Sequence, residues 1–211
     1  MRIAILAANG RLGKALVIEA LVAGHSVRAG VRGSNNLAPH PELEIVQCDA
    51  TKPADVRYLL EGQQIVFSAL GHVKGSTPDV QTNATKTVLD IMSELGLNRF
   101  VDVTGTGARF PGDKILPVDR FLNWAVGMID PSRIKDGQNH VELLKTSGID
   151  WTVIRVLKLQ NVKQKPYTLL LHGPTKLYVG RSEVAHAMLE VAEKNIFLKQ
   201  APIIGRFKGT K

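Results

Sequence analysis

Two glycines near the start of the chain have the spacing of a phosphate-binding turn. The apolar run 2–7 is typical of a strand, and residues 14–23 carry apolar side chains at helical spacing, so Gly10 and Gly13 fall in a strand–turn–helix unit. In such a turn the backbone N–H groups and the positive end of the helix dipole face an anion. One glycine would admit the close backbone approach, and the other would admit tight packing of the helix on the strand. The predicted contacts of a dinucleotide pyrophosphate are Gly10, Arg11, Leu12 and Gly13, with Asn9 as a polar support of the turn.

The glycine spacing alone does not establish a nucleotide site. The strict G-x-G-x-x-G fingerprint is absent, and Ala7 stands where a looser G-x-x-G-x-x-G would begin. Strand-to-helix turns that contain glycine also occur without any ligand. The interpretation therefore depends on the residues that follow.

The end of the next predicted strand indicates which dinucleotide would bind. Residues 25–31 are typical of a strand that ends at Arg32, and no Asp or Glu stands nearby. An acidic residue at this point accepts hydrogen bonds from the ribose 2′-OH of NAD, whereas a basic residue accommodates the 2′-phosphate of NADP. Arg32 therefore favours NADP(H), with Ser34 or Asn35 as helpers and NAD(H) as the second candidate. The alternative is a solvated surface arginine.

A carboxylate follows the third predicted strand, at residues 43–47. Asp49 lies at the strand end, where it could accept a hydrogen bond from the adenine amino group. It could equally cap the helix that begins near Pro53. The two roles are compatible.

The middle of the chain continues the alternation of strands and helices. We expect a helix at 53–60, a strand at 64–70, a helix from 77 or 78 to 95, and a fifth strand at 99–103 followed by a turn at 104–107. This even spacing predicts an α/β fold with a doubly wound parallel, Rossmann-like sheet, in a single domain spanning 1–211. Ligands of such sheets bind outside the carboxyl ends of the strands. The residues expected there are Ala69, Leu70, Thr104 and the turn Gly71-His72.

Composition narrows the classes of function. The 211 residues, 44% of them hydrophobic, suffice for one sizeable core, and no run approaches the ~20 apolar residues of a membrane span. We expect no signal peptide and no membrane, and the single Cys48 fits the reducing cytoplasm as a core residue. The net charge of +8 favours anionic ligands, but the basic residues are too dispersed to favour nucleic acid. The scattered histidines lack H-x-x-x-H spacing, so no metal site is expected.

Several stretches together resemble a known family. Residues 7–13 resemble the GATGxxG turn of the atypical short-chain dehydrogenase/reductases, the NAD(P)H-binding set that includes NmrA-like proteins and biliverdin-IXβ/flavin reductases. Residues 31–32, 48–49, 144–155 and 179–189 are similar to further segments of that family. The resemblance covers nearly the whole chain and implies a Rossmann-like fold with an NAD(P)H cofactor.

The chain departs from the wider superfamily at its catalytic pair. Classical members use Tyr-x-x-x-Lys as acid or base, but the corresponding positions here are Ile134 and Gln138. None of Tyr58, Tyr167 and Tyr178 begins such a motif. This favours a reductase that passes hydride from NADPH to a flavin, quinone or similar conjugated acceptor, which needs no strong protein acid. The alternative is a non-enzymatic NADP(H) sensor like the NmrA-type regulators, and a third reading is a nucleic-acid-associated member.

The substrate side is expected from about 105–130 and 155–180. Thr104 matches the first residue of the family's Thr-Ser turn and Gly105 replaces the serine, so Thr104 and Thr106 are the candidate hydroxyls for orienting substrate or nicotinamide. Both could instead satisfy local backbone groups. The loop 109–117, beside the nicotinamide end, would form a lid or a pocket wall. The apolar, aromatic-bearing helix around 121–128 would more simply be part of the core. Arg155, in a strand at 151–157, is expected near the cleft. The remaining predicted elements are helices at 134–146 and 182–194 and strands at 167–171 and 201–204.

Overall fold

The computed structural model describes residues 1–73, 75–162 and 165–206. The strands are β1 (Arg2–Leu6), β2 (Ser26–Val31), β3 (Leu43–Gln47), β4 (Ile65–Ser68), β5 (Arg99–Gly105), β6 (Asp150–Val156), β7 (Leu159–Gln160), β8 (Tyr167–Leu170), β9 (Val179–Gly180) and β10 (Ile203–Arg206). The helices are α1 (Arg11–Val22), α2 (Pro53–Leu60), α3 (Val80–Leu95), α4 (Pro117–Ile129), α5 (Pro131–Thr146) and α6 (Arg181–Glu193). None of the helices among these residues is both long and apolar enough to cross a membrane.

One eight-stranded sheet organises the chain, in the order β3-β2-β1-β4-β5-β6-β10-β8. Neighbouring strands run parallel from β3 to β10, as the sequence predicts. The sheet departs from parallel pairing at one edge, where β8 pairs antiparallel with β10. β7 and β9 form a separate short parallel pair. The chain therefore has the Rossmann-like α/β fold, with one antiparallel edge strand.

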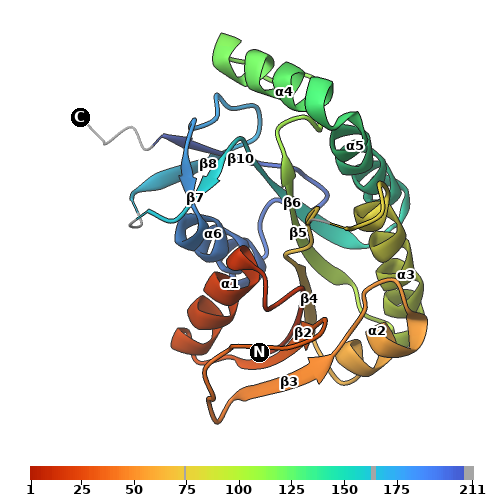
Figure 1. Ribbon diagram of the computed structural model, residues 1–211. Helices are drawn as coiled ribbons and strands as arrows, with labels where there is room; N and C mark the ends of the chain where they lie inside the picture. Colours follow the sequence, from red (N-terminus) through yellow and green to blue (C-terminus); the bar gives the residue numbers. More distant parts are fainter. Residues whose placement is uncertain (74, 163–164, 207–211) are drawn as a thin grey trace.

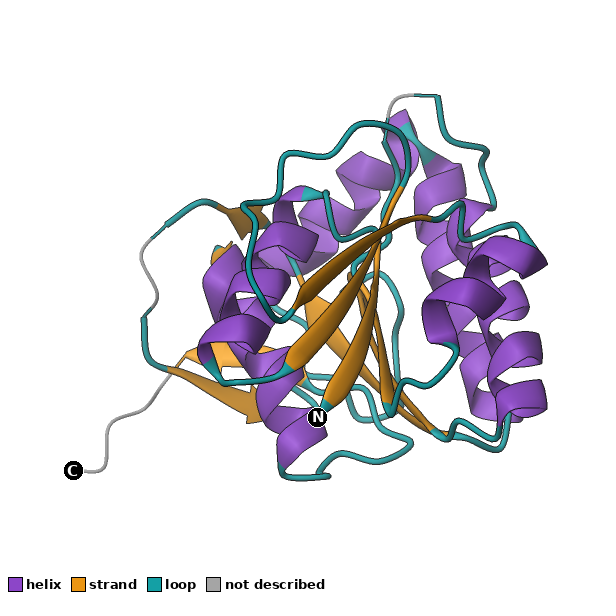
Figure 2. Cartoon of the chain, turned by 90° about the horizontal axis from the view of Figure 1, so that it is seen from below, coloured by secondary structure: helices purple, strands orange, loops and turns teal. Residues whose placement is uncertain are grey.

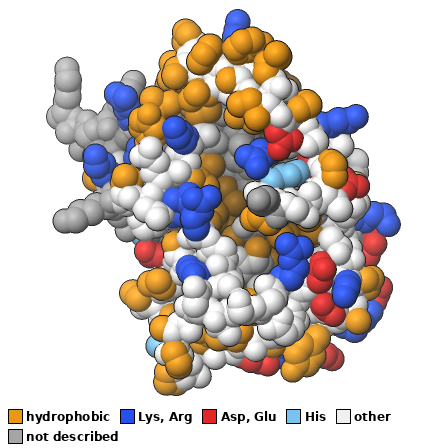
Figure 3. Space-filling model, viewed as in Figure 1, with side chains coloured by type: hydrophobic (Ala, Val, Ile, Leu, Met, Phe, Trp, Pro, Cys, Tyr) orange, Lys and Arg blue, Asp and Glu red, His pale blue; other side chains and the backbone are white. Residues whose placement is uncertain are grey.

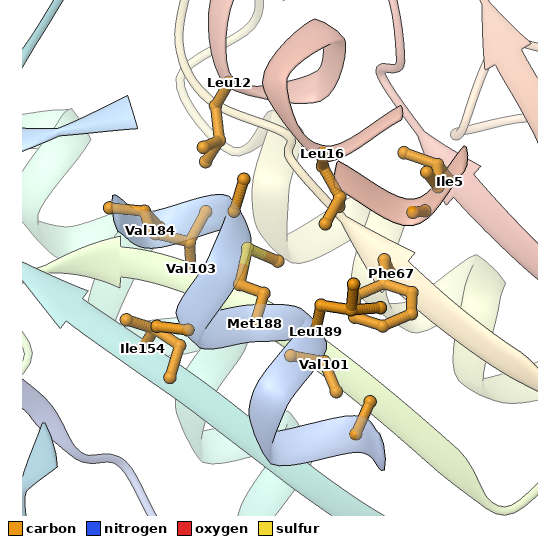
Figure 4. Close-up of a cluster of buried hydrophobic side chains, with 14 of the residues drawn as sticks. Ile5, Leu12, Leu16, Phe67, Val101, Val103, Ile154, Val184, Met188 and Leu189 are labelled. Carbon is orange, nitrogen blue, oxygen red and sulfur yellow. The ribbon is translucent and has the colours of Figure 1, made fainter. Parts of the chain in front are cut away.

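Helices cover both faces of the sheet. Figures 1 and 2 show α1 and α6 side by side on one face and α2, α3 and α5 on the other, while α4 lies beyond the end of the sheet. The strands are buried on both faces, and alternate residues serve opposite layers. In β1, Ile3 and Ile5 pack in the layer under α1 and α6, whereas Ala4 and Leu6 pack in the layer under α2, α3 and α5. Figure 4 shows Met188 and Leu189 of α6 over the side chains of the central strands.

The boundaries of two elements differ from the expectations for tertiary reasons. Helix α3 begins at Val80 rather than at 77 or 78, and the backbone N–H groups of Gln81 and Thr82 donate to the Asp136 carboxylate of α5 at 2.9 Å each. Strand β5 extends past residue 103, because Thr104 and Gly105 pair with β6. Thr104 therefore lies in a strand and not in a turn.

Helix α4 is longer and more exposed than predicted. It begins at Pro117, whose fixed φ suits the first helical position, and its single buried residue is Asp119. Phe121 and Trp124 are each 60% exposed, so the core alternative for this aromatic helix is wrong. Figure 3 shows hydrophobic side chains gathered over α4.

Candidate active site

The glycine turn joins β1 to α1 closely. The N–H of Gly10 donates to the Ala7 carbonyl at 2.9 Å, and a Cβ on Gly13 would stand 2.3 Å from that same carbonyl oxygen. Gly13 is therefore the residue that admits tight contact of helix on strand. No side chain among the described residues caps α1, so its first N–H groups are open to an anion.

Ala7 carries backbone strain in this turn. Its φ of 55° is in the left-handed region, where an L side chain costs about 1–2 kcal/mol. We expect Ala7→Gly to raise the free energy of unfolding by roughly 0.5–1 kcal/mol, since glycine's greater freedom in the unfolded chain offsets part of the relief. Urea denaturation measures this. Ala38→Gly, in an exposed loop with ordinary φ, is the control and should be neutral or slightly destabilising; an equal loss in both variants would contradict the strain.

Asn9 connects the glycine turn to the loop after β2. Its Nδ2 donates to the Ser34 carbonyl at 2.7 Å, and its Oδ1 accepts from the Asn36 N–H at 3.4 Å. This brings the turn and the loop bearing Arg32 together at the same edge of the sheet. Arg32 itself is exposed, directly after β2.

Asp49 lies near Arg32 at the end of β3. It accepts hydrogen bonds from the Thr51 hydroxyl and N–H, which, with the charges of Arg32 and Lys52, hold the pKa of Asp49 below its usual value. The helix-capping alternative for Asp49 is wrong. Lys52 is the N-cap of α2, and Asp55 in its first turn accepts from the Asp49 N–H at 2.9 Å.

Cys48 is a core residue, as predicted. It is 6% exposed, and burial together with the carboxylates of Asp55 and Asp49 raises the pKa of its thiol to about 12. A thiol in this state is not a nucleophile at neutral pH.

A cavity of about 400 Å³ opens at the carboxyl ends of β4, β5 and β6, between the start of α1 and α5. Figure 3 shows the hollow, with apolar atoms inside it and basic side chains at its border. Its apolar lining includes Leu70, Val103, Val126, Ile134, Val156, Leu157 and Leu159. Its basic lining is Arg11, Arg133, Lys158 and Arg181. An apolar pocket with a few converging polar groups is the usual form of a small-molecule site.

Two helix N-termini meet at this cavity, each beginning with an arginine. Arg11 opens α1 and Arg181 opens α6. Partial burial and the positive charge of Arg11 lower the pKa of Arg181, whose guanidinium also donates to the Asn161 side chain at 2.6 Å. Two like charges and two helix dipoles make this edge of the cavity favourable for an anion.

The two candidate hydroxyls differ in their surroundings. Thr104 is buried and lines the cavity, and Gly137 of α5 lets that helix approach, because a Cβ there would stand 3.1 Å from the Thr104 hydroxyl. The Thr106 hydroxyl donates to Asp119 at 2.9 Å and accepts from Asn123 at 3.1 Å. Since the Thr106 proton is engaged within the protein, Thr104 is the better placed to face a ligand.

Asp119 anchors α4 to the loop that follows β5. Arg109 binds its carboxylate with two hydrogen bonds, at 2.9 and 3.0 Å, and Thr106 and Asn123 complete its partners. The carboxylate is buried, so these donors offset its desolvation. The wall of the cavity formed by the turn and α4 is thereby fixed in place.

Arg155 does not reach the cleft, contrary to expectation. It is fully buried and forms two hydrogen bonds with Asp113, at 2.5 and 2.9 Å. Its remaining donors go to the carbonyl oxygens of Ala108, Leu171 and Ala201. Arg155 therefore fastens the loop after β5 to the β6, β8 and β10 side of the sheet.

The positions of the superfamily's tyrosine and lysine hold residues without acid–base chemistry. Ile134 lines the cavity, and the Gln138 side chain donates to the Gly107 carbonyl at 3.0 Å. The cavity has no tyrosine among its described lining residues. Nor do the described residues contain a cluster of three or more His, Cys, Asp or Glu that could hold a metal.

The sequence did not predict two pairings at the site. His72 lines the cavity, as expected of the turn after the fourth strand, and is paired with Asp136 of α5. Arg181 lies near Arg11 in the lining of the same cavity. Asp136 and Arg181 lie in helices far along the chain, and no local pattern connects them to the glycine turn.

The fold and the site together define a dinucleotide-binding protein of the oxidoreductase type. Comparison with known proteins agrees: residues 7–195 match the model of the NAD(P)H-binding family, and the chain belongs to that family. The predicted Rossmann-like fold and the NAD(P)H cofactor are thereby confirmed.

Two relatives show how far the similarity extends. A chloroplastic protein of Arabidopsis thaliana is 26% identical, over all of this chain and 79% of the relative. A 3β-hydroxysteroid dehydrogenase/Δ5→4-isomerase of Mycobacterium tuberculosis is 26% identical over 85% of this chain, which spans only 54% of that enzyme.

Solved structures share the fold. A short-chain dehydrogenase/reductase of Veillonella parvula in complex with NADP superposes with a TM-score of 0.81 at 19% identity, covering 99% of this chain and 95% of that one. A proposed NADH-flavin reductase of Streptococcus pneumoniae has a TM-score of 0.74 at 24% identity, with 97% and 98% covered.

Proposed function

We propose that the protein is an NADPH-dependent reductase that transfers hydride to a flavin, quinone or similar conjugated small molecule. The observation that carries the proposal is the cavity itself, whose walls are largely apolar and whose described lining offers Ile134 where a catalytic tyrosine would stand. Apolar walls suit a flat, conjugated acceptor. The proposed NADH-flavin reductase with the same fold is consistent with this class of acceptor.

The residues of the cleft fit a dinucleotide. The uncapped start of α1, which Gly13 lets pack tightly against β1, suits a pyrophosphate held by Gly10, Arg11, Leu12 and Gly13. We assign Arg32 to the 2′-phosphate and Asp49 to adenine. Ala69, Leu70 and Gly71 would follow the cofactor toward the cavity, where Thr104 would orient the nicotinamide or the acceptor.

The chain's contribution to the chemistry is chiefly placement. A bound reduced nicotinamide supplies the hydride, and a conjugated acceptor spreads the resulting charge over its own π-system. The rigid floor of β5 and β6 and the fixed wall around Asp119 would hold the two reactants in contact and exclude water. The substrate side is assigned to residues 105–130 and 155–180.

Arg32→Ala should weaken NADPH binding about 10–100-fold and leave NADH binding nearly unchanged. A charge-assisted contact to phosphate contributes about 1.5–3 kcal/mol, and only NADPH carries the 2′-phosphate. Calorimetric titration with both cofactors measures the difference. Arg57→Ala removes the same charge from a solvent-exposed position of α2, so it serves as the control and should not change the affinity for either cofactor. Parallel losses for NADPH and NADH in Arg32→Ala would contradict the assignment.

The proposed activity is tested by NADPH consumption, followed through the nicotinamide absorbance with FMN, riboflavin and several quinones offered in turn and NADH in parallel. We expect saturable turnover with at least one acceptor and a preference for NADPH. Tight NADPH binding without consumption would instead favour an NADP(H) sensor. Salt-sensitive retention on RNA or DNA would favour the nucleic-acid-associated reading.

We place this activity in the cytoplasm. The buried, unreactive Cys48 is consistent with a reducing compartment. The chloroplastic relative makes an organelle the alternative, which localisation of a tagged full-length protein would distinguish.

A further inference from the structure

We propose that His72, held by the buried carboxylate of Asp136, donates the proton that the acceptor takes up when hydride reaches it. The proposal rests on the proposed reductase function and adds to it a group that supplies the proton. His72 follows β4 in the turn that lines the cavity, and its Nε2 stands 2.8 Å from Asp136 Oδ2. The His72 and Asp136 side chains are 6% and 1% exposed, respectively.

The partners of Asp136 determine which nitrogen of His72 carries the proton. The carboxylate also receives the N–H groups of Gln81 and Thr82 and the Thr82 hydroxyl, at 2.9, 2.9 and 2.5 Å. Because Asp136 receives donors on both oxygens, it is a carboxylate, and the His72 Nε2 must also donate to it. In the neutral ring, Nδ1 is then the basic nitrogen, and the protonated ring carries a second N–H there.

Asp136 is fixed more firmly than a surface carboxylate could be. It belongs to α5 and binds the first turn of α3, so the orientation of the His72 ring is set by two packed helices. On the same helix, Ile134 and Gly137 line the cavity beside Thr104. The histidine–carboxylate pair thus borders the cavity where a tyrosine hydroxyl is missing.

The proton transfer completes the balance of the reaction. Hydride carries two electrons and one hydrogen from the reduced nicotinamide to the acceptor, which leaves an oxidised nicotinamide and a reduced acceptor anion. The Nδ1–H bond of protonated His72 breaks and its proton joins a nitrogen or oxygen of that anion. Solvent then returns a proton to the neutral ring, so NADPH, acceptor and H⁺ yield NADP⁺ and the protonated product.

Charged groups lie around the His72–Asp136 pair. Asp136 faces it from α5, and Asp130 lies near enough that the charge of His72 contributes to lowering the pKa of Asp130, after its bonds to Ser132 and Arg133. Arg133 pairs with Asp130 at 3.7 Å, and it also borders the cavity. His140 reaches the backbone carbonyl of Asp136 at 3.2 Å, and Asp102 faces its other nitrogen at 3.2 Å from the sheet side.

The decisive variant is His72→Gln, in which the amide can still donate to Asp136 but cannot titrate. With an acceptor that turns over, we expect kcat/KM of the wild type to fall as pH rises, because general acid catalysis needs the proton donor in its protonated form. At low pH, kcat/KM of the variant should be about 10²-fold below that of the wild type, and it should not change with pH, in line with general acid catalysis. Its NADPH affinity and thermal midpoint should remain near the wild type. His40→Gln, on the exposed loop before β3, is the matched control and should keep the wild-type profile.

A second readout does not depend on turnover. Nitrogen-15 NMR of the histidine rings, with the His72 signal assigned by its loss in His72→Gln, should show the neutral ring protonated at Nε2. A neutral ring protonated at Nδ1, or a variant whose pH profile matches that of the wild type, would overturn the proposal. If the protein binds NADPH but none of the acceptors tested leads to its oxidation, the proposed reductase function fails. The NMR result tests the His72 proposal independently of that outcome.

Discussion

Replacing Gly13 with alanine should abolish measurable NADPH binding and lower the free energy of unfolding by about 2–3 kcal/mol. The added Cβ would lie 2.3 Å from the Ala7 carbonyl oxygen and 2.7 Å from the Ala8 Cα, and both are backbone atoms that no rotamer change can move. The start of α1 would have to shift away from β1, which costs overpacking energy and displaces the N–H groups that we assign to the pyrophosphate.

Urea denaturation and calorimetric titration with NADPH measure the two parts of this prediction. Gly10→Ala is the internal comparison, because its Cβ would meet the Ala7 carbonyl oxygen at 3.1 Å, a contact that a shift of a few tenths of an ångström relieves. It should weaken binding less and cost less stability. A Gly13→Ala protein with wild-type affinity would show that the turn does not hold the cofactor.

Asp113→Ala should destabilise the protein by about 3–5 kcal/mol, the largest loss of stability that we expect from a single substitution. The change leaves the Arg155 guanidinium buried without its carboxylate, and an unpaired buried charge is far more costly than an exposed one. Asp113 also accepts the Phe110 N–H at 2.9 Å, so the loop after β5 loses an anchor as well. Burial opposes ionisation of Asp113, yet its bonds from Arg155 and Phe110 hold its pKa below the usual value.

The double variant Asp113→Leu with Arg155→Met separates the cost of a stranded charge from the value of the pair. Because both charges are removed together, much of the lost stability should return. Lys86→Ala, which breaks the exposed Lys86–Asp90 pair, should change the free energy of unfolding by less than about 0.5 kcal/mol. A loss below about 1 kcal/mol for Asp113→Ala would contradict the structural role assigned to this pair.

The sheet could be predicted from the sequence because its signals are local. A strand buried on both faces is a continuous apolar run, as in β1, and each connecting helix repeats apolar residues at its own spacing. The antiparallel direction of β8 could not be predicted, because it depends on the long connection between β8 and β10 and not on the four residues of β8. The start of α3 was missed for a similar reason, because its cap comes from Asp136, which is 55 residues further along the chain.

The places in the fold of the residues proposed to hold the cofactor could be predicted from the sequence better than those on the proposed substrate side. The glycine turn, Arg32 and Asp49 each stand directly after a strand, where the fold itself brings them to one edge. Arg155 also stands near a strand end, yet it is buried among the carbonyl groups of Ala108, Leu171 and Ala201, which only the folded chain brings together. The apolar periodicity of α4 likewise could not reveal that Phe121 and Trp124 are exposed.

We propose that this cleft holds NADP(H) with the nicotinamide at the apolar cavity. A crystal structure of the protein soaked with NADP⁺ tests it most directly. We predict the pyrophosphate on the first turn of α1, the 2′-phosphate in contact with Arg32, and the nicotinamide ring in the cavity beside Thr104, with room for a flat acceptor against Ile134. A dinucleotide whose nicotinamide end lies outside the cavity, or whose 2′-phosphate lies away from Arg32, would contradict the account.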